Sequence, residues 1–196
     1  ALKSGDKIAR AELEVLDKIS PALEAGRSAR TVELTNDERA VAQNFFLLTT
    51  KPTIFAANVD ENTLADRGPN TLVKIVEDIA QRDAAECVVI CAQLEAELVA
   101  LPLEERLDYL SHLGVSTSGV DRLIKSAYHL LGLMSFLTAG EKEVRAWTIP
   151  QGTRAQTAAG VIHSDIERGF IRAEIVGYEN LIAAGSYAAA RDKGLL

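Results

Sequence analysis

Cysteine and histidine are scarce in this chain. Its 196 residues include only two cysteines, Cys87 and Cys91, and three histidines. Two thiols four positions apart, without a second Cys or His pair, match neither a zinc site nor a disulfide framework. If both lie on one strand, the thiols face the same side and are too far apart to bond. We therefore expect buried free thiols, which suit a reducing cytosol.

The sequence also lacks a long apolar run and an excess of positive charge. No segment approaches the roughly 20 apolar residues that span a bilayer, so no membrane partner is expected. Hydrophobic residues make up 47% and charged residues 25%, as in ordinary globular proteins, and the length allows one domain or two small ones. A net charge of −7 argues against wrapping nucleic acid with the whole surface, and no DNA partner is expected. A local basic patch is still compatible with that charge.

A phosphate-binding loop is missing as well. The pattern G-x-x-x-x-G-K-[ST] occurs nowhere in the sequence. The backbone amides of that loop cradle phosphates, and its Ser or Thr binds magnesium. We therefore do not expect this chain alone to hydrolyse a nucleoside triphosphate.

Hydrophobic periodicity predicts helices in the first part of the chain. Residues 6–25 contain apolar positions at three- and four-residue steps. This stripe consists of Leu13, Leu16, Ser20 and Leu23. So narrow a stripe is typical of one arm of a helical hairpin, whose partner arm we expect upstream of Ala1. A second helix is predicted from Thr35 or Asn36 by the capping-box spacing of residues 35–38.

The middle of the chain predicts a parallel sheet. Two short apolar runs, residues 52–57 and 87–92, flank a helical pattern at residues 70–81. Buried strands joined by a helix indicate a βαβ unit. Residues 102–131 are expected to form helical connections. The large aromatic side chains expected in the core are Phe45, Phe46 and Trp147.

Residue composition changes near residues 132–136, where we place a domain boundary. Beyond it, strand-like runs at residues 136–139 and 144–149 indicate a hairpin. A helix is expected at residues 157–167 and a further strand at residues 170–176.

The first candidate site is the polar turn that follows the first predicted strand. Ligands of open α/β sheets bind at the carboxyl ends of the strands. Asn58 offers an amide donor and acceptor, and Glu61 offers a carboxylate that accepts from the N–H groups of a base. Guanine-binding NTPases have Asn-Lys-x-Asp here, so Val59 and Glu61 replace the Lys and the Asp. Because an unpaired buried polar group costs ~1–3 kcal/mol, this change relaxes or reverses base preference. The alternative interpretation is an ordinary strand-to-helix turn.

The second candidate site lies at the end of the next strand. Cys91, Ala92 and Gln93 stand where the guanine-binding pattern has Ser-Ala-Lys. Backbone N–H groups contact the base at this position, and such contacts tolerate changes of side chain. The alternative interpretation is a strand end without a functional role.

The third candidate site surrounds His163. A histidine close to Asp165 suggests acid–base chemistry, but no activated Ser or Cys nucleophile and no second histidine at metal-ligand spacing accompany it. One interpretation is a capped, solvated helix end. The other is a binding surface for RNA or a partner, in which Arg154, Arg168 and Arg172 contact phosphates.

Three stretches of the sequence carry a resemblance to a known family. Residues 143–150 and 158–174 resemble the TGS domain of the YchF, or Obg-like ATPase, family. Residues 57–61 resemble the modified base-recognition motif of that family, Asn-x-x-Glu, with Asn58 and Glu61 at its ends. The resemblance extends over essentially the whole chain, as the C-terminal two-thirds of such a protein.

The resemblance implies an α/β fold. A partial P-loop NTPase-type parallel sheet with a helical, coiled-coil arm would be followed by an incomplete β-grasp TGS domain. Residues 1–45 would form the arm, residues 46–133 the C-terminal part of the G domain, and residues 134–196 the TGS domain. The phosphate loop, the switch regions and the magnesium ligands are implied upstream of this chain.

The resemblance also implies a function. The implied protein is a cytoplasmic, ribosome-associated nucleotide hydrolase that prefers ATP over GTP and uses Mg²⁺. Its base-binding residues here would be Asn58, Val59, Glu61, Cys91, Ala92 and Gln93. The TGS domain and the helical arm would face the ribosome or RNA. The alternative, from a different class, is a non-enzymatic adaptor whose TGS domain binds RNA or the ribosome without turnover.

Overall fold

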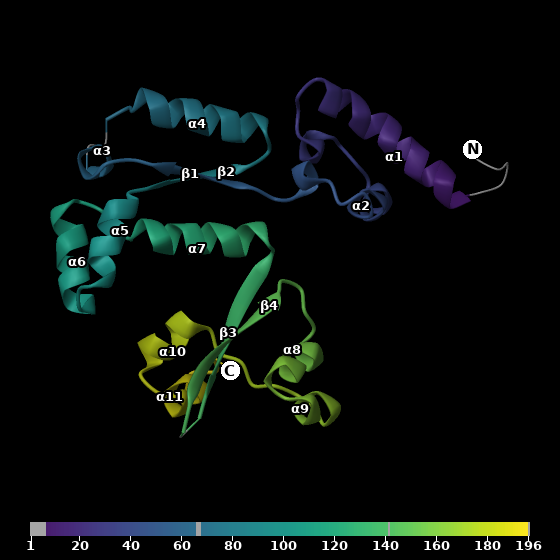
Figure 1. The fold of residues 1–196 in the computed structure, drawn as a ribbon. Coiled ribbons are helices and arrows are strands. Elements are labelled where there is room, and N and C mark those ends of the chain that lie inside the picture. The colour runs from purple at the N-terminus through teal and green to yellow at the C-terminus, as the bar shows by residue number, and fades with distance from the viewer. Residues whose placement is uncertain (1–6, 66–67, 141, 196) are drawn as a thin grey trace. The chain divides into compact units, whose positions relative to one another are not determined.

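The computed structural model of the chain describes residues 7–65, 68–140 and 142–195. The chain divides into two compact units, Ala1–Leu131 and Gly132–Leu196, called here the first and the second unit (Figure 1). The predicted helix start at residue 6 lies outside the described residues, as does residue 141 of the predicted hairpin turn.

Helices predominate in both units. The elements of the first unit are α1 (Lys7–Glu24), η1 (Ala29–Thr31), α2 (Asn36–Gln43), η2 (Leu48–Thr50), β1 (Ile54–Asn58), α3 (Glu61–Ala65), α4 (Thr71–Arg82), β2 (Glu86–Ile90), α5 (Ala92–Val99), α6 (Leu103–His112) and α7 (Gly119–Leu130). Those of the second unit are β3 (Leu133–Ala139), β4 (Val144–Pro150), α8 (Ala155–Ile162), α9 (Ser164–Arg168), α10 (Tyr178–Ala184) and α11 (Tyr187–Asp192).

Helix α1 confirms the first predicted helix, but its buried face is not the predicted one. The predicted stripe from Leu13 to Leu23 is exposed. The buried residues are instead Val15, Ile19 and Ala22, which face η1 and α2. Both stripes repeat at three- and four-residue steps, so periodicity alone does not distinguish them.

Helix α2 begins where the capping box predicts. Thr35 Oγ1 accepts from Glu38 N at 3.3 Å, and Thr35 N donates to Glu38 Oε2 at 3.0 Å. Beyond the helix, Phe45 packs half-buried against the core that α1 and α2 share. Phe46 is 88% exposed, so its predicted core position is wrong. Its φ of 50° turns the chain out of the helix and leaves the ring in solvent.

Strands β1 and β2 form a small parallel sheet in the register Ile54↔Glu86 to Asn58↔Ile90. Helix α4 covers one face of this sheet and α7 covers the other (Figure 1). Asn70 begins α4 by accepting hydrogen bonds from Leu72 N and Val73 N. This arrangement confirms the predicted βαβ unit and the α/β class.

Helix α5 follows β2 without a connecting loop, and the sequence does not predict it. Its residues Leu94 and Leu98 are buried with Cys91 and Leu110, and the four form a core cluster. Helices α6 and α7 confirm the predicted helical connections. Gly114, which has a φ of 68°, follows the end of α6.

The second unit begins with the predicted hairpin, β3 and β4, paired antiparallel from Leu133↔Pro150 to Ala139↔Val144. Trp147 is half-buried rather than deep in a core. Its Nε1 donates to Thr138 Oγ1 at 2.9 Å, and the Arg145 guanidinium lies 4.1 Å from the ring centroid.

The predicted helix at residues 157–167 is broken in two at His163. This residue is extended (φ −164°, ψ 142°), and its Nδ1 accepts from Asp165 N, which begins α9. Helix α9 packs against α8. A Cβ at position 160 would overlap the carboxylate of Glu167, so Gly160 permits this close approach.

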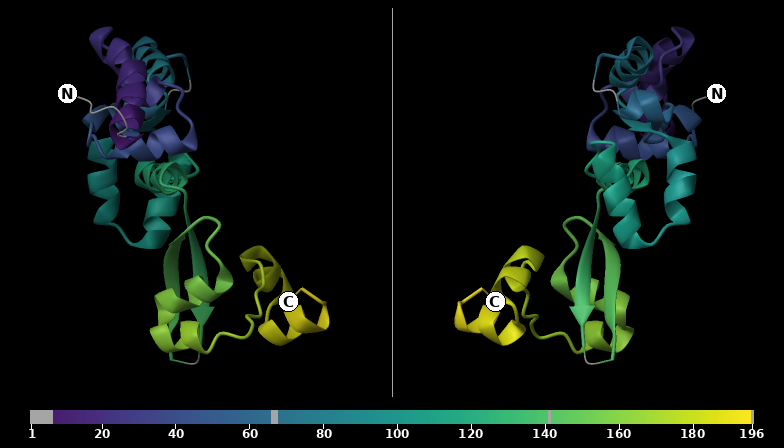
Figure 2. Two further views of the ribbon diagram at one scale, coloured as in Figure 1. Left: turned by 90° about the vertical axis from the view of Figure 1, so that its right-hand side faces the viewer. Right: turned by 90° about the vertical axis from the view of Figure 1, so that its left-hand side faces the viewer.

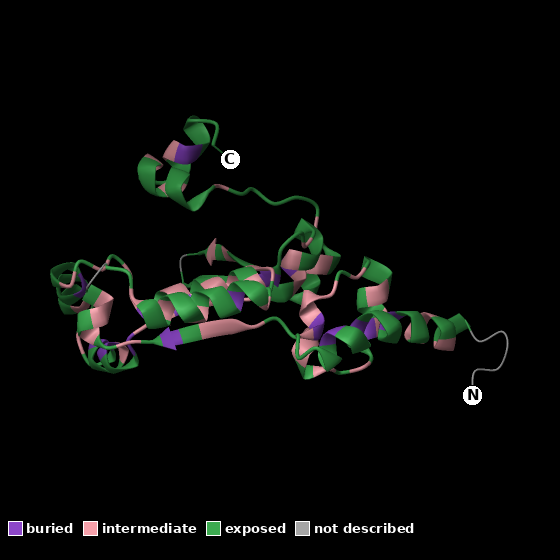
Figure 3. Cartoon of the chain, turned by 90° about the horizontal axis from the view of Figure 1, so that it is seen from above, coloured by how far each residue is buried: buried purple, intermediate pink, exposed green. Residues whose placement is uncertain are grey.

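The predicted strand at residues 170–176 is wrong. The segment pairs with neither β3 nor β4, and Ile171 and Ile175 are 92% and 70% exposed (Figure 3). A strand is defined by its ladder, and the apolar pattern alone supplies no partner. Helices α10 and α11, which the sequence does not predict, pack against each other at the end of this segment (Figure 2).

Candidate functional site

The carboxyl ends of β1 and β2 bring the first two candidate sites together. Asn58 pairs with Ile90 at the last position of the register, and Val59 N donates to Ile90 O at 2.8 Å. The residues that follow each strand are therefore neighbours, because parallel strands end at the same edge of a sheet. Val59 is half-buried there.

Asn58 joins the two turns directly. Its Oδ1 accepts a hydrogen bond from Ala92 N at 2.9 Å, across 34 residues of sequence. Ala92 is the first residue of α5, and its N-cap residue Cys91 makes no side-chain capping bond. Asn58 thus satisfies one of the free amides at the start of that helix. No acceptor for Asn58 Nδ2 is recorded among the described residues, so its N–H donors remain for a ligand.

The hydrogen bond from Ala92 changes one expectation from the sequence. The Ala92 amide, predicted to donate to a base, is already engaged by Asn58. Gln93 N is the next amide of the first helical turn and has no intrahelical acceptor. The Gln93 side chain donates from Nε2 to Glu97 Oε1 at 3.2 Å, one turn along α5.

The two carboxylates that follow Asn58 are used differently. Asp60 Oδ1 accepts from Thr63 N at 2.7 Å and caps α3, and this hydrogen bond lowers the pKa of Asp60. Glu61 is the first residue of α3, and its Oε1 accepts from the hydroxyl of Tyr109 at 3.1 Å. The hydrogen bond to Glu61 and the negative charge of that residue raise the pKa of Tyr109.

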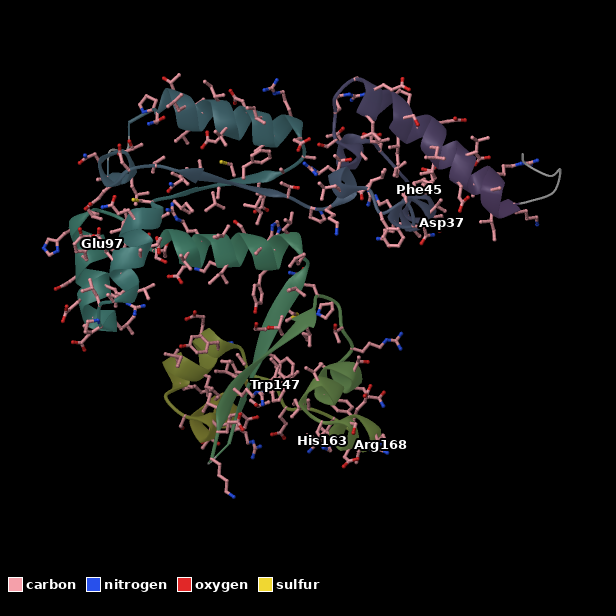
Figure 4. All side chains as sticks on the ribbon, viewed as in Figure 1. Asp37, Phe45, Glu97, Trp147, His163 and Arg168 are labelled. Carbon is pink, nitrogen blue, oxygen red and sulfur yellow. The ribbon has the colours of Figure 1, made fainter. Side chains whose placement is uncertain are left out.

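Sequence reasoning does not find Tyr109, which lies on α6, 48 residues beyond Glu61. Its ring lines a hollow of about 490 Å³ at α5 and α6. The other lining residues are Glu97, Leu98, Leu101, Glu105, Asp108 and His112. Figure 4 labels Glu97 on α5.

Both cysteines are free thiols, as predicted. Cys91 is 2% exposed and belongs to the core cluster with Leu94. Cys87 is half-buried, and burial raises its pKa, with a smaller contribution from the charge of Glu77. A buried thiol at position 91 leaves only its backbone for contact with a ligand.

The start of α7 is held against α5 by Glu95. Its Oε1 accepts from Gly119 N at 2.5 Å, at the first residue of α7. A Cβ at position 119 would lie 2.9 Å from that oxygen and 3.0 Å from Ile90 Cγ2, so a larger residue here would displace the Glu95 carboxylate. Arg122 Nη2 donates to Val89 O at 2.8 Å and fixes α7 to β2.

The third candidate site lies wholly within the second unit. Arg154 is the N-cap residue of α8, and His163 lies between α8 and α9 with an exposed ring. His163 and Arg168 lie near one another (Figure 4). Asp165 joins them, because its N donates to His163 Nδ1 at 3.1 Å and its Oδ1 accepts from Arg168 Nη2 at 2.5 Å. His163 is therefore a helix cap here, as one of the two interpretations predicts.

The three arginines of this site differ in whether an acidic side chain lies close to them. Arg168 is paired with Asp165, and Arg172 Nη2 lies 4.0 Å from Glu174 Oε1. No acidic partner is recorded for Arg154 among the described residues. Arg154 is thus the guanidinium most available to an external anion.

Two further properties bear on function. Residues 7–65, 68–140 and 142–195 contain no cluster of three or more His, Cys, Asp or Glu side chains placed to hold a metal ion. Within the same residues, no helix combines the length and apolar character that a membrane span requires.

Comparisons with known proteins agree on one family. The family model YchF-GTPase_C, described as "Protein of unknown function (DUF933)", matches residues 133–196. The chain is 46% identical over 192 residues to the ribosome-binding ATPase YchF of Bacillus subtilis, and 41% identical to that of Escherichia coli O157:H7. Each alignment covers 98% of this chain and 52% of the relative.

The fold agrees with a solved structure of the same family. The YchF GTPase of Schizosaccharomyces pombe superposes with a TM-score of 0.82 at 29% identity. The match covers 100% of this chain and 53% of that chain. The chain thus spans about half the length of the relatives it matches, rather than the two-thirds expected from the resemblance.

Proposed function

The chain belongs to the YchF family, and on that premise we propose that its first unit recognises the base of a nucleoside triphosphate in a cytoplasmic, ribosome-associated ATPase. Asn58, Val59 and Glu61 form one side of the proposed base site. Cys91, Ala92 and Gln93 form the other through their backbone.

One observation carries this proposal. Asn58 Oδ1 accepts from Ala92 N at 2.9 Å, and this hydrogen bond connects the two turns that the sequence assigns to the base. Both turns lie at the carboxyl ends of adjacent parallel strands, where ligands of open α/β sheets bind. The geometry therefore supports a single site made from two motifs that are distant in sequence.

The polar groups of this edge suit adenine. Adenine presents its N6 amino group as a donor and its ring nitrogens as acceptors. The Glu61 carboxylate can accept from the amino group, and Asn58 Nδ2 or Gln93 N can donate to a ring nitrogen. We therefore propose that ATP is preferred over GTP. Mg²⁺ is expected to accompany the triphosphate, with its ligands outside this chain.

The second unit is proposed to contact the ribosome as an incomplete β-grasp TGS domain. Two observations support this role. The curated relatives carry the name ribosome-binding ATPase, and the second unit contains the hairpin and helix that such a domain needs. Arg154, His163, Arg168 and Arg172 are the proposed contact residues. A non-enzymatic adaptor would use the same surface and would differ in lacking turnover.

The base site can be tested by calorimetric titration of the full-length protein with ATP in the presence of Mg²⁺. Asn58→Ala removes both the bridge to Ala92 and the donor toward the base, and should weaken ATP binding by ~1–3 kcal/mol. Asn58→Asp keeps an acceptor for Ala92 N but loses the donor, and should weaken binding without loss of thermal stability. Asn44→Ala, at an exposed position, is the matched control.

Each outcome of this titration has a defined meaning. Unchanged ATP affinity in both Asn58 variants would remove the base site from the first unit. ATP binding without release of inorganic phosphate, in the presence and absence of ribosomes, would favour the adaptor over the hydrolase.

A further inference from the structure

Tyr109 and Glu61 form a side-chain pair that neither sequence motif contains. The Tyr109 hydroxyl donates to Glu61 Oε1 at 3.1 Å and connects the end of the strand β1 region to α6. The neighbouring carboxylate of Asp60 does not compete for this hydroxyl, because Asp60 is engaged in capping α3. The tyrosine therefore contacts the carboxylate that is the proposed acceptor for the base.

A hydrogen bond that one carboxylate oxygen already accepts limits which ligand donors the carboxylate can recognise. A free carboxylate offers two oxygens and accepts two parallel donors in a bidentate pair. Guanine presents two such donors side by side, its N1–H and its 2-amino group. Adenine presents a single amino group beside a ring acceptor. Tyr109 takes one lone pair of Oε1, so the two oxygens of Glu61 are no longer equivalent acceptors. Oε2, which has no recorded partner among the described residues, keeps both lone pairs and matches the single amino donor of adenine.

We propose that Tyr109 is a positioning residue that sets base specificity, because its hydrogen bond to Glu61 Oε1 fixes the orientation of the carboxylate and competes with bidentate capture of guanine. This inference rests on the proposed function of the first unit as a base-binding site. It assigns the discrimination between adenine and guanine to a residue outside both sequence motifs.

The protonation of Tyr109 is consistent with this role. The hydrogen bond to Glu61 and the charge of Glu61 raise the pKa of Tyr109, with burial and the charge of Glu97 adding to the rise. The raised pKa favours the protonated phenol, which is the form that donates to Glu61. Because the ring also lines the hollow beside α5, removal of the hydroxyl alone leaves its packing in place.

The test is a titration of the full-length protein and its Tyr109→Phe variant with ATP, GTP and inosine triphosphate. Phe keeps the ring and frees Oε1. The GTP affinity should rise relative to ATP by about fivefold to tenfold, the worth of one hydrogen bond. Inosine triphosphate has the N1–H but lacks the 2-amino group, so its gain should be smaller. Tyr178→Phe, an exposed tyrosine of the second unit, is the matched control.

A double-mutant cycle separates specificity from structure. If Tyr109 acts through Glu61, Tyr109→Phe should leave the ATP-to-GTP ratio unchanged in a Glu61→Gln background. An unchanged ratio in the single Tyr109→Phe variant overturns the inference. Equal weakening of all three nucleotides together with a lowered melting temperature also overturns it, because this would show a purely structural role.

The two Asn58 variants separate a failure of the Tyr109 role from a failure of the proposed base site. If they weaken ATP binding while Tyr109→Phe leaves the ratio unchanged, base recognition stands and the role of Tyr109 fails. If the Asn58 variants bind ATP normally, the base site itself fails, and the inference fails with it.

Discussion

The two units of the chain differ sharply in charge. Residues 132–196 contain seven lysine or arginine residues and seven aspartate or glutamate residues, so the whole net charge of −7 belongs to residues 1–131. An acidic surface repels the phosphates of RNA, whereas a neutral one with local arginines does not. The difference is in keeping with the proposed contact between the second unit and RNA.

The two units also differ in how they are held together. The first unit contains two clusters of buried side chains, one around Ile19 and one around Leu94. In the second unit the buried apolar residues are Ile149, Ala159 and Ala190, which belong to three separate elements. Its order rests more on the hairpin ladder and on local helix contacts. We therefore expect mutations of the core to affect the first unit most.

The largest expected effect is that of Leu94→Ala. Leu94 is 1% exposed, and its truncation should cost about 2–5 kcal/mol because a cavity remains. Trp147, the sole tryptophan, lies in the second unit and reports on that unit alone. In a urea titration, the far-UV circular dichroism midpoint should fall while the Trp147 fluorescence midpoint stays. Leu72→Ala, at a position 74% exposed, is the control. Midpoints that fall together would mean that the units unfold as one.

A smaller loss of stability is expected within the first unit, where η1 contacts the residues that follow η2 and α4. Arg30 of η1 donates from Nε to Asp83 O at 3.0 Å and from Nη1 to Lys51 O at 3.1 Å, and its Nη2 pairs with the Asp83 carboxylate. Arg30→Ala would leave these acceptors without a partner in a partly buried place, at a cost of about 1–3 kcal/mol. Arg27→Ala, at an exposed position, should change the unfolding free energy by less than about 0.5 kcal/mol.

The same pair predicts a pH dependence. Hydrogen bonds from Ser28 and Arg30 lower the pKa of Asp83 in the folded protein. A lowered folded pKa contributes stability above the unfolded value, and this contribution is lost as pH falls through the folded value. The unfolding free energy should therefore fall below about pH 4. Asp83→Asn should be less stable than the natural chain at pH 7 and should approach it as the pH falls through the lowered pKa of Asp83. A constant gap across this range would contradict the assignment.

The sequence predicts elements where a local signal is sufficient. The capping box at Thr35 and the apolar runs of β1 and β2 each define their element from a few neighbouring residues. The predicted buried face of α1 and the predicted strand at residues 170–176 are wrong, because each depends on a packing or pairing partner. Two stripes on α1 have the same spacing, and only packing against α2 selects one. A strand needs a neighbouring strand, which no local pattern encodes.

The candidate base site shows the same limit. The spacing of Asn58 and Glu61 is visible in the sequence, and the structure brings Asn58 to Ala92. Tyr109 has no such signal, because it reaches Glu61 only through the folding of α6 against this region. The engagement of the Ala92 amide is likewise a consequence of the start of α5, which the sequence does not predict.

The smallest expected effects concern the proposed contact of the second unit with the ribosome. Arg154 lacks a recorded acidic partner among the described residues, whereas Asp165 pairs with Arg168 at 2.5 Å. If Arg154 contacts a phosphate, Arg154→Gln should reduce the slope of log affinity against log salt by about 0.7–0.9. Asp165→Asn should change it in the opposite direction, because it frees Arg168 for a further contact. Co-sedimentation with ribosomes over a range of salt concentrations measures both slopes.

Because Arg154→Gln and Asp165→Asn should change the salt slope in opposite directions, the experiment tests whether individual arginines of the second unit contact phosphates. Arg172→Gln should reduce the slope by less than Arg154→Gln does. Glu174 lies 4.0 Å from Arg172 and compensates its charge only in part. Arg82→Gln on α4 removes the same charge from the acidic first unit and should leave the slope unchanged. A uniform loss in all the arginine variants would mean that total charge, rather than the surface around Arg154, governs the attraction to RNA.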